Sequence, residues 1–526
     1  MLDLVLHGGV VLTQAHGDVV AKPTAVGIRG GRVALVGDDP SVLRAAGPAT
    51  ERVHLGGRTI VPGFNDAHAH IWKIGHLLTT MVDLRGVETL AELIERVRRA
   101  ADQLPPGAWI LGRGYNEVAM GHRPPTRSDL DRAAPGRAVA LTRTCGHIYS
   151  VSSRALEHAG IGPSTEAPAG GVIERDEQGQ PNGLLHETAM GLINRVIPQP
   201  TSGDYEAMIS AALRHQLMFG ITSSADCGVS PQLLSVYRSM DANGALPSRI
   251  NVMPLRLLDG AAEPVPLPEA FVSDMLRVDT VKFLADGGLS GATAALSVPY
   301  RHQETRGVLR FSTDSLRGLS AESHDAGWRI ATHAIGDVAI DQVLDVYESL
   351  GLHPRGLAHR IEHFGLPSAA QLARAARLGV IAAPQTIFIK ELGRNFRSYL
   401  PQAFLPRTYP VRAMLDAGIT VALSSDAPVV EDDNPLSGMA AAITRRDADG
   451  ELIAPREAIS AAEALYAYTM GGAIATGDEM NRGSIEAGKW ADLAVLSDNP
   501  LEESPEGLPR LTVDMTLVAG RVAFER

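Results

Sequence analysis

Residues 61–70 read VPGFNDAHAH, a short apolar run that ends in two histidines. Side chains two positions apart on a β-strand point to the same face, so His68 and His70 are expected to face one common point. Neutral imidazole is a frequent ligand of divalent transition metals. The pair alone is not specific, because a chain with 17 histidines can carry such a pair in its core or on its surface. The stretch therefore predicts a strand with a candidate metal site at its end.

Seven further short apolar runs follow, and segments of helical periodicity, such as 341–351 and 368–379, separate several of them. This alternation is typical of repeated βα units around a parallel sheet. The eight expected strands lie in TIVPGFNDAHAH (59–70), GITSSAD (220–226), INVMPLRL (250–257), TVKFLADGG (280–288), RIATHAIGD (329–337), HRIEHFG (359–365), VIAAPQTI (380–387) and ITVALSSDAP (419–428). We therefore predict an α/β fold, a TIM-type (β/α)8 barrel whose active site forms at the C-terminal ends of the strands.

The two ends of the chain differ from this middle part. Residues 1–60 and 480–526 are rich in short, glycine-punctuated β segments, which fit antiparallel strands joined by tight turns. We expect both ends to form one small composite β-sandwich, whose exposed strand edge offers a place for two chains to pair as a homodimer. The barrel domain then spans 61–479, and the long separation of its first two strands predicts an insertion at about 72–205 over the barrel mouth.

Three later strand ends carry further side chains of the metal-ligand type. They are His333 in RIATHAIGD, His363 in HRIEHFG and Asp426 in ALSSDAP. Because barrel strands place catalysis at this position, we interpret these residues and the first two histidines as one site. Four histidines with an aspartate favour Zn2+ over Mg2+ or Ca2+, without excluding Mn2+, Fe2+ or Ni2+.

The bulk composition excludes several other classes of protein. With 45% hydrophobic and 21% charged residues the chain is typical of globular proteins, and no apolar run approaches the roughly 20 residues that a membrane helix needs. A net charge of −12 without a basic tract disfavours nucleic acid, which leaves a small-molecule substrate as the expected partner. The first residues lack the features of a secretory signal, so a cytoplasmic location is expected. Cys145 and Cys227 are too few for a disulfide framework and are expected to be reduced.

Longer motifs around these residues resemble the amidohydrolase superfamily, and within it the branch labelled amidohydrolase family 3, or YtcJ-like metal-dependent hydrolases. The matching stretches cover nearly the whole chain and together are highly specific: VPGFNDAHAH, RTCGHIYSVSSRAL, GITSSAD, VKFLADGG, THAIGD, HRIEH, SSDAPV and GSIEAGKWADLAVL. The resemblance implies a hydrolase that uses one or two divalent metal ions to cleave a carbon–nitrogen bond other than a peptide bond. Amide, N-acyl, N-formyl and cyclic amide substrates all fit.

The same resemblance implies a role for each ligand-type residue. His68 and His70 would bind one metal, and His333 and His363 would bind the second. Asp426 would contact the metal-bound water and act as the general base that accepts its proton.

Lys282 is one of only five lysines and lies in an apolar predicted strand. A protonated ammonium group would be repelled by metal cations, and its ordinary pKa of about 10.4 keeps it charged at neutral pH. The resemblance implies that Lys282 reacts with carbon dioxide to form a carbamate that bridges two metals. The alternative is an ion pair between Lys282 and Asp286, and we favour the carbamate because a simple ion pair does not need this apolar strand.

Substrate contacts are expected from the insertion. The candidates are Trp72, Tyr115, Arg143 and His147, of which His147 lies in the family-like stretch CGHIYS. Outside the insertion, Asp337 and Glu362 are expected to orient the histidine ligands through hydrogen bonds.

The fold and the metal ligands do not decide the reaction by themselves. Decarboxylation, ring deamination or ester hydrolysis on the same metal site is one alternative, and product analysis separates these reactions. A non-catalytic metal-binding scaffold is the second alternative. The presence of Asp426 beside four histidines argues against a scaffold, since structural zinc sites are closed by four ligands that are mostly cysteines.

Overall fold

The computed structural model describes residues 1–526 except 16–21, 118–119, 122, 145, 147, 169–170, 188, 259–262, 290–291 and 302–303. The chain packs as two units: residues 1–71 with 212–526, and residues 72–211. The second unit is one continuous stretch of the chain that lies between two parts of the first unit in sequence. Among the described residues, no helix has the length and apolar character needed to cross a membrane.

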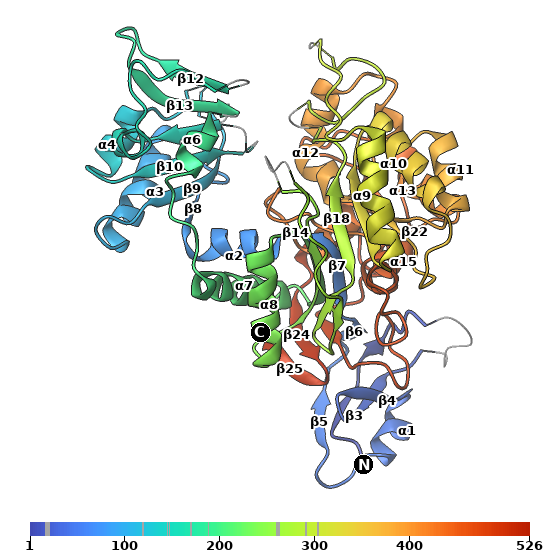
Figure 1. Cartoon of the computed structure of the whole chain (residues 1–526). Helices are drawn as coiled ribbons and strands as arrows, with labels where there is room; N and C mark the ends of the chain where they lie inside the picture. Colours follow the sequence, from blue (N-terminus) through green and yellow to red (C-terminus); the bar gives the residue numbers. More distant parts are fainter. Residues whose placement is uncertain are drawn as a thin grey trace. The chain divides into compact units, whose positions relative to one another are not determined.

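Parallel strands form the centre of the first unit, and helices alternate with them along the chain (Figure 1). Each of the eight predicted runs overlaps one of these strands: β7 (Phe64–Ala69), β14 (Ile221–Val229), β15 (Arg249–Pro254), β18 (Thr280–Leu284), β19 (Arg329–Ala334), β20 (Arg360–His363), β21 (Ile381–Ala383) and β22 (Thr420–Val421). The first three pair in the order β15-β14-β7, and the other five pair in chain order. The helices after them include α8 (Pro231–Ala242), α9 (Thr313–Asp325), α10 (Asp337–Leu350), α11 (Ala369–Arg377), α12 (Ile387–Tyr399) and α13 (Val411–Asp416). This is the mixed α/β content that the sequence predicts.

Backbone contacts connect the two groups of parallel strands. Leu255, directly after β15, pairs with Lys282 of β18, and the Arg256 amide donates to the Lys282 carbonyl at 3.1 Å. At the other edge, the Asp426 amide donates to the His68 carbonyl at 2.8 Å, and the His70 amide donates to the Ala427 carbonyl at 2.9 Å. The segment after β22 therefore lies beside the end of β7.

The predicted run 59–70 forms two strands instead of one. β6 (Thr59–Pro62) pairs with β23 (Leu493–Leu496), whereas β7 pairs with β14. The break falls at Gly63, where a side chain would meet Thr222: a Cβ there would lie 2.2 Å from Thr222 Oγ1. Glycine is thus required where the chain between β6 and β7 approaches Thr222 of β14. The expectation of a single strand over residues 59–70 was wrong at this point.

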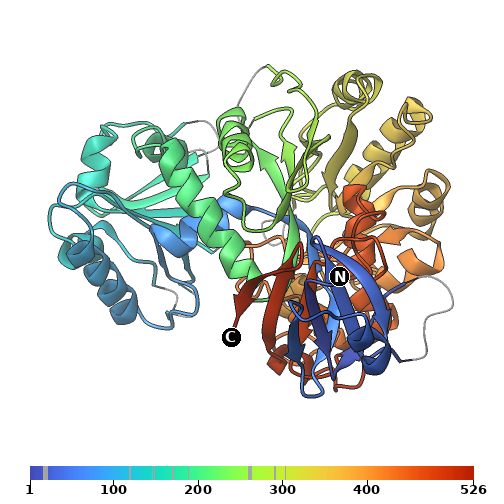
Figure 2. The same cartoon turned by 90° about the horizontal axis from the view of Figure 1, so that it is seen from below.

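Two sheets from the ends of the chain share one hydrophobic core, and one of these sheets contains strands from both ends. One sheet has the order β4-β3-β1-β5 and the other β2-β6-β23-β24-β25. Their strands are β1 (Leu4–His7), β2 (Val10–Val11), β3 (Ala25–Arg29), β4 (Arg32–Gly37), β5 (Glu51–His54), β24 (Val513–Val518) and β25 (Arg521–Glu525), with α1 (Asp39–Arg44) after β4. Leu6 and Val26 of one sheet and Ile60 and Leu517 of the other belong to the shared core. Figure 2 shows the first strands of the chain beside the last ones.

The sequence predicts antiparallel strands at both ends of the chain, but two of the observed pairs are parallel. β1 pairs with β5 in parallel, and β2 pairs with β6 in parallel. The chain leaves β1, passes through the antiparallel pair of β3 and β4 and the helix α1, and returns in the original direction. This crossover makes the parallel pairing possible, and glycine-rich turns alone do not reveal it.

The second unit contains a six-stranded sheet with the order β12-β13-β11-β10-β9-β8. Its elements include β8 (Met81–Asp83), β9 (Ile110–Tyr115), β10 (Val139–Arg143), β11 (Ile148–Val151), β12 (Gly171–Arg175), β13 (Pro181–Glu187), α3 (Leu90–Gln103), α4 (Arg127–Ala133), α5 (Ser153–His158) and α6 (Met190–Asn194). Alternate residues of this sheet enter different cores, because Val139 and Leu141 pack in one and Ala138 and Ala140 in the other. The sheet is therefore buried on both faces.

Of the remaining helices, two lie at the beginning and end of the second unit in sequence, and three follow β22. They are α2 (Ile71–Thr79), α7 (Ser202–Leu217), α14 (Pro435–Thr444), α15 (Ala461–Tyr466) and α16 (Gly472–Thr476). A π-helical turn, Ala467–Gly471, connects α15 to α16. The last two helices lead the chain from the parallel strands back to the terminal sheets.

The Gly63→Ala variant tests the close approach between β6, β7 and Thr222. The added methyl group would overlap a buried, β-branched side chain, so we expect the free energy of unfolding to fall by about 1–3 kcal/mol. Urea denaturation followed by tryptophan fluorescence measures it. Gly318→Ala is the matched control, because Gly318 is exposed in α9 with open space around it and should become more stable by up to about 1 kcal/mol. Equal stability of the two variants would show that the contact is unimportant.

Candidate metal centre

The predicted ligands all lie in the first unit, and most of them lie at the ends of its parallel strands. His68 is near the end of β7 and His70 follows directly, while His363 is the last residue of β20. His333 lies near the end of β19, and Asp426 follows β22. Lys282 lies in the middle of β18. Of these six side chains, only those of His70 and His333 have appreciable exposure, 21% and 14%.

The structure brings the four histidines and the aspartate together. The ring centroids of His68 and His363 lie 4.8 Å apart, and those of His333 and His363 lie 4.4 Å apart. Asp426 Oδ1 lies 3.2 Å from His70 Nε2 and 3.5 Å from His68 Nε2. His68, His363 and Asp426 form a compact group whose ligand atoms lie within 4.8 Å of one another. These atoms can converge on a metal ion.

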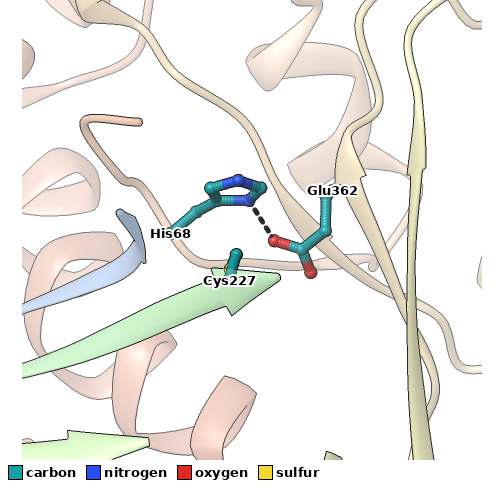
Figure 3. A group of neighbouring side chains, drawn as sticks. All are labelled: His68, Cys227 and Glu362. Carbon is teal, nitrogen blue, oxygen red and sulfur yellow. Dashed lines mark hydrogen bonds and ion pairs between the residues drawn. The ribbon is translucent and has the colours of Figure 1, made fainter. Parts of the chain in front are cut away.

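A buried carboxylate fixes the orientation of His68. Glu362 Oε2 accepts a hydrogen bond from His68 Nδ1 at 2.5 Å, and Figure 3 shows the imidazole edge directed at this carboxylate. Arg360 binds the same carboxylate through two hydrogen bonds, from Nε at 2.8 Å and Nη2 at 3.0 Å. Burial opposes the ionisation of Glu362, yet its neighbours Arg360, Lys282 and His68 hold its pKa well below the usual range. With Nδ1 engaged, His68 presents Nε2 to Asp426.

His363 is held in an unusual backbone conformation. Its φ angle is +67°, in the left-handed region that residues with a side chain rarely adopt. The ring donates from Nδ1 to Gln385 Oε1 at 2.6 Å, and the Gln385 amide group in turn donates to Ser424 Oγ at 2.9 Å. Such conformations persist where the surroundings fix them and are typical of functional sites.

Asp426 also has a positive φ angle, +56°, and a second buried aspartate holds the residue before it. Asp66 accepts hydrogen bonds from the amide and hydroxyl of Ser425 at 3.0 and 2.5 Å, and from the His68 amide at 3.3 Å. Burial raises the pKa of Asp66 to about 7, although the Ser425 hydrogen bonds oppose this shift. Sequence analysis missed Asp66, yet the alternation of Asp66, His68 and His70 along one strand could have indicated it.

His333 and Asp286 form a separate contact at the edge of the group. His333 Nε2 donates to the Gly287 carbonyl at 3.1 Å and lies 3.3 Å from Asp286 Oδ1. Asp286 also accepts hydrogen bonds from the amides of Ala295, Ile335 and Gly336. A metal ion bound by His333 would have to use the other ring nitrogen or displace the hydrogen bond to Gly287.

Lys282 does not form the alternative ion pair with Asp286. Its side chain is 1% exposed, and within the described ranges Nζ has no hydrogen-bond partner. The Asp286 carboxylate instead accepts hydrogen bonds from the backbone amides of Ala295 and Gly336. A buried amine without a partner is costly, so its presence beside this group suggests that a ligand or a modification completes it.

The charges of the group suit metal binding. Burial lowers the pKa of His68 and His363, which keeps both imidazoles neutral and able to donate a lone pair. Burial alone would raise the pKa of Asp426, but the neighbouring His68, His70 and His363 hold it well below its usual range. Neutral imidazoles and an ionised carboxylate are the donor set of zinc-type sites.

Cys227 belongs to a second candidate group that sequence analysis did not predict. Its thiol, with His68 and Glu362, forms a set of ligand atoms within 4.8 Å (Figure 3). Burial raises the pKa of Cys227, which disfavours the thiolate that binds metals. Glu362 is also committed to Arg360 and His68. Cys227 is a free thiol, as expected, and packs with Ala225, Met253 and Ala331 in a small apolar cluster.

The predicted substrate contacts belong to the second unit, where they have local partners. Tyr115 is fully buried in a hydrophobic core, so it has no surface for a ligand in this structure. Arg143 binds Glu117 through two hydrogen bonds, at 2.7 and 2.8 Å. Trp72 stacks on His76 with 6.0 Å between ring centroids. His147 lies outside the described residues.

The two residues expected to orient histidines differ in outcome. Glu362 accepts a hydrogen bond from His68 and so orients one of the histidines, as expected. Asp337 accepts hydrogen bonds from the Ser297 amide and hydroxyl and approaches Arg407, so the expected contact with a histidine was wrong. Asp337 is the first residue of α10, and it binds Ser297 of a preceding loop instead of a metal-ligand histidine.

Comparisons with known proteins agree with this fold. A sequence profile of the amidohydrolase family matches residues 51–524. The chain is 32% identical to N-substituted formamide deformylase of Arthrobacter pascens, over 100% of this chain and 99% of that protein. It is 30% identical to the putative amidohydrolase YtcJ of Bacillus subtilis (strain 168), over 100% of each. An uncharacterized metal-dependent hydrolase from Pyrococcus horikoshii has a similar structure, with a TM-score of 0.79 and 26% identity over 96% of this chain and 99% of that one.

The Arg360→Met variant tests the buried ion pair beneath the group. It would leave the Glu362 carboxylate buried without its main counter-charge, so we expect the free energy of unfolding to fall by about 3–5 kcal/mol. Arg317→Met removes an exposed ion pair with Asp314 and should change it by no more than about 1 kcal/mol. Urea denaturation of both variants gives the comparison. A loss as small for Arg360 as for Arg317 would mean that the pair does not stabilise the fold.

Proposed function

The chain belongs to the amidohydrolase family and is a metal-dependent hydrolase of carbon–nitrogen bonds, and we propose that its substrate is a small, non-peptide amide. Amide, N-acyl, N-formyl and cyclic amide groups fit the proposal. The name of the Arthrobacter relative, which specifies a formamide, supports the N-formyl class among these. The products would be a carboxylic acid and an amine, or one opened chain carrying both groups.

One observation carries this proposal: four imidazoles and a carboxylate from the ends of four strands meet in a small, mostly buried volume. The His363 ring centroid lies 4.8 Å from that of His68 and 4.4 Å from that of His333, and Asp426 contacts His68 and His70. Histidines that serve only to pack a core do not need a shared carboxylate held in a strained backbone conformation.

We infer that His68, His70, His333, His363 and Asp426 hold one or two divalent metal ions, with Zn2+ preferred. The neutral imidazoles and the ionised aspartate fit this group. When bound, such an ion lowers the pKa of a coordinated water from about 15.7 towards 7 and polarises a carbonyl oxygen.

Lys282 would complete the donor set as a carbamate. Its uncharged amine would attack carbon dioxide, forming an N–C bond and losing one proton, and the product is an anion with two oxygen donors. The buried Nζ atom, which lacks a hydrogen-bond partner among the described residues, supports this modification. An anion at this position would also compensate metal charge, which an ammonium group cannot do.

Asp426 would act as the general base. Its low pKa keeps the carboxylate ionised, and its Oδ1 atom lies among the ligand atoms that would surround the attacking water. The carboxylate would accept a proton as the water attacks the amide carbon, and would return that proton to the departing nitrogen. The hydrogen bonds that His68 donates to Glu362 and His363 donates to Gln385 would keep the two rings in place during these steps.

We further infer that the eight parallel strands close into a (β/α)8 barrel of the TIM type. The pairing of Leu255 with Lys282 and the hydrogen bonds that connect residues 426–427 to the end of β7 support closure. In such a barrel the C-terminal ends of all strands surround one point, which is where the candidate ligands lie. The terminal sheets would be the composite β-sandwich of residues 1–60 and 480–526, with the insertion of 72–205 after the first barrel strand.

The proposed reaction is tested with the zinc-loaded protein and a panel of N-formyl amines, N-acyl amines and cyclic amides. We expect acid and amine groups to appear in equal amounts from at least one class, and Asp426→Asn to lower kcat/KM by about 10²–10⁴-fold because proton transfer is lost. Asp416→Asn, a change in an exposed ion pair with Arg412, is the control and should leave kcat/KM unchanged. Release of ammonia or carbon dioxide instead, or full activity of Asp426→Asn, would reject the proposed reaction.

A further inference from the structure

Apart from the candidate metal centre, the first unit contains a polar cavity that four arginines line. The cavity has a volume of about 250 Å3. Arg32 comes from β4, Arg249 is the first residue of β15, Arg277 lies in β17 (Leu276–Val278), and Arg482 follows α16. Elements from both ends of the chain and from the parallel strands therefore contribute to one basic cavity.

This cavity is separate from the candidate metal centre. Arg249 begins its parallel strand and Arg277 precedes β18, whereas His68 and His363 lie at the ends of β7 and β20. The two sites therefore occupy opposite ends of the parallel strands, and none of the proposed metal ligands lines the cavity. The metal centre does not account for the arginines.

Ion pairs neutralise only part of the positive charge. Asp492 accepts two hydrogen bonds from Arg249, at 2.6 and 3.0 Å, and Asp279 accepts one from Arg277 at 2.8 Å. Asp478 lies 2.8 Å from Arg482 Nε and 3.7 Å from Arg277 Nη2.

Three carboxylates thus face four guanidinium groups. Asp274 also lines the cavity, but it is exposed to solvent and accepts from Arg249 only through its backbone carbonyl. A positive charge therefore remains to attract an anion.

Arg482 has a buried donor that nothing satisfies. The residue is 6% exposed, its Nη2 donates to Thr476 Oγ1 at 2.9 Å, and its Nη1 atom has no hydrogen-bond partner in the described part of the chain. A buried donor without a partner costs about 1–3 kcal/mol, and more when it is charged. Arg482 also lines the cavity, so an anion bound there would lie next to its guanidinium group.

Arg32 also lines the cavity, and two contacts hold its side chain. Its guanidinium group lies 3.8 Å from the ring centroid of Trp490, whose ring also faces Arg249 at 4.6 Å. Arg32 Nη1 donates to the Gly488 carbonyl at 2.8 Å, which uses one of its five N–H groups. Cation–π stacking of this kind orders the side chain before any ligand arrives.

We propose that this cavity binds a small oxyanion, a phosphate or carboxylate group, that accepts hydrogen bonds from Arg277 and Arg32 and is attracted by the charge of Arg482. Guanidinium groups match such acceptors in charge and in fork geometry. The cavity is several times larger than the roughly 30 Å3 that one water occupies in the liquid, so it has room for a compact anion with some of its hydration. Binding there would connect the terminal sheets to the beginning of the parallel strands.

The test is calorimetric titration of the zinc-loaded protein with inorganic phosphate at constant ionic strength, and with acetate as the carboxylate probe. We expect saturable phosphate binding that Arg277→Gln and Arg32→Gln each weaken at least tenfold. Arg44→Gln, a change at an exposed arginine of α1, should alter it less than twofold. Because the two cavity arginines are not metal ligands, kcat/KM should stay unchanged in these variants.

The controls separate the cavity from the metal centre. Acetate that displaces phosphate at similar concentrations assigns a carboxylate ligand, and phosphate that binds at least tenfold more tightly assigns a phosphate group. Phosphate binding that both variants retain, with competitive inhibition of turnover, would place the anion at the metal and overturn the proposal. Absence of saturable binding by either probe would overturn it as well.

Discussion

The position of the candidate metal centre depends on one buried ion pair. Glu362 is fully buried, and it accepts hydrogen bonds both from Arg360, within its own strand, and from His68 on β7. Arg360 also donates to the Ala67 carbonyl at 2.7 Å and the Ala475 carbonyl at 3.2 Å. A charge pair at this depth rarely stabilises a protein more than apolar packing would, so its value is the fixed orientation that it gives to an imidazole.

Strained backbone at two of the proposed ligands also helps to fix the orientation of their side chains. His363 and Asp426 both have positive φ angles, which cost about 1–3 kcal/mol each for residues with a side chain. Hydrogen bonds from His363 to Gln385, and from Ser425 to Asp66, hold the two segments in this state. The ligand side chains are thus directed towards one another by the protein alone, which reduces the reorganisation that metal binding requires.

Features that repeat locally in the sequence were predictable. Each of the eight apolar runs overlaps a parallel strand, and the alternation in VPGFNDAHAH places His68 and His70 near Asp426. Features that arise from contacts between distant residues were not predictable. The break at Gly63 depends on Thr222, and the parallel pairing of β1 with β5 depends on the path of the chain between them.

The same reason explains the errors at individual residues. Asp337 follows the motif of His333, yet it accepts its hydrogen bonds from Ser297, which lies in a loop. Tyr115 is an expected substrate contact of the insertion, but its ring lies in a hydrophobic core. The roles of Arg360, Gln385 and Asp66 depend on the side chains opposite them, which a single sequence does not reveal.

The most direct test of this account is a crystal structure of the zinc-loaded protein with anomalous data collected at the zinc absorption edge. The account predicts anomalous peaks within bonding distance of His68 Nε2, His70, His363 and Asp426, with density for a carboxylate group on Lys282 Nζ. A peak bound instead by Cys227 and Glu362, with His70 and Asp426 uncoordinated and Lys282 unmodified, would contradict it.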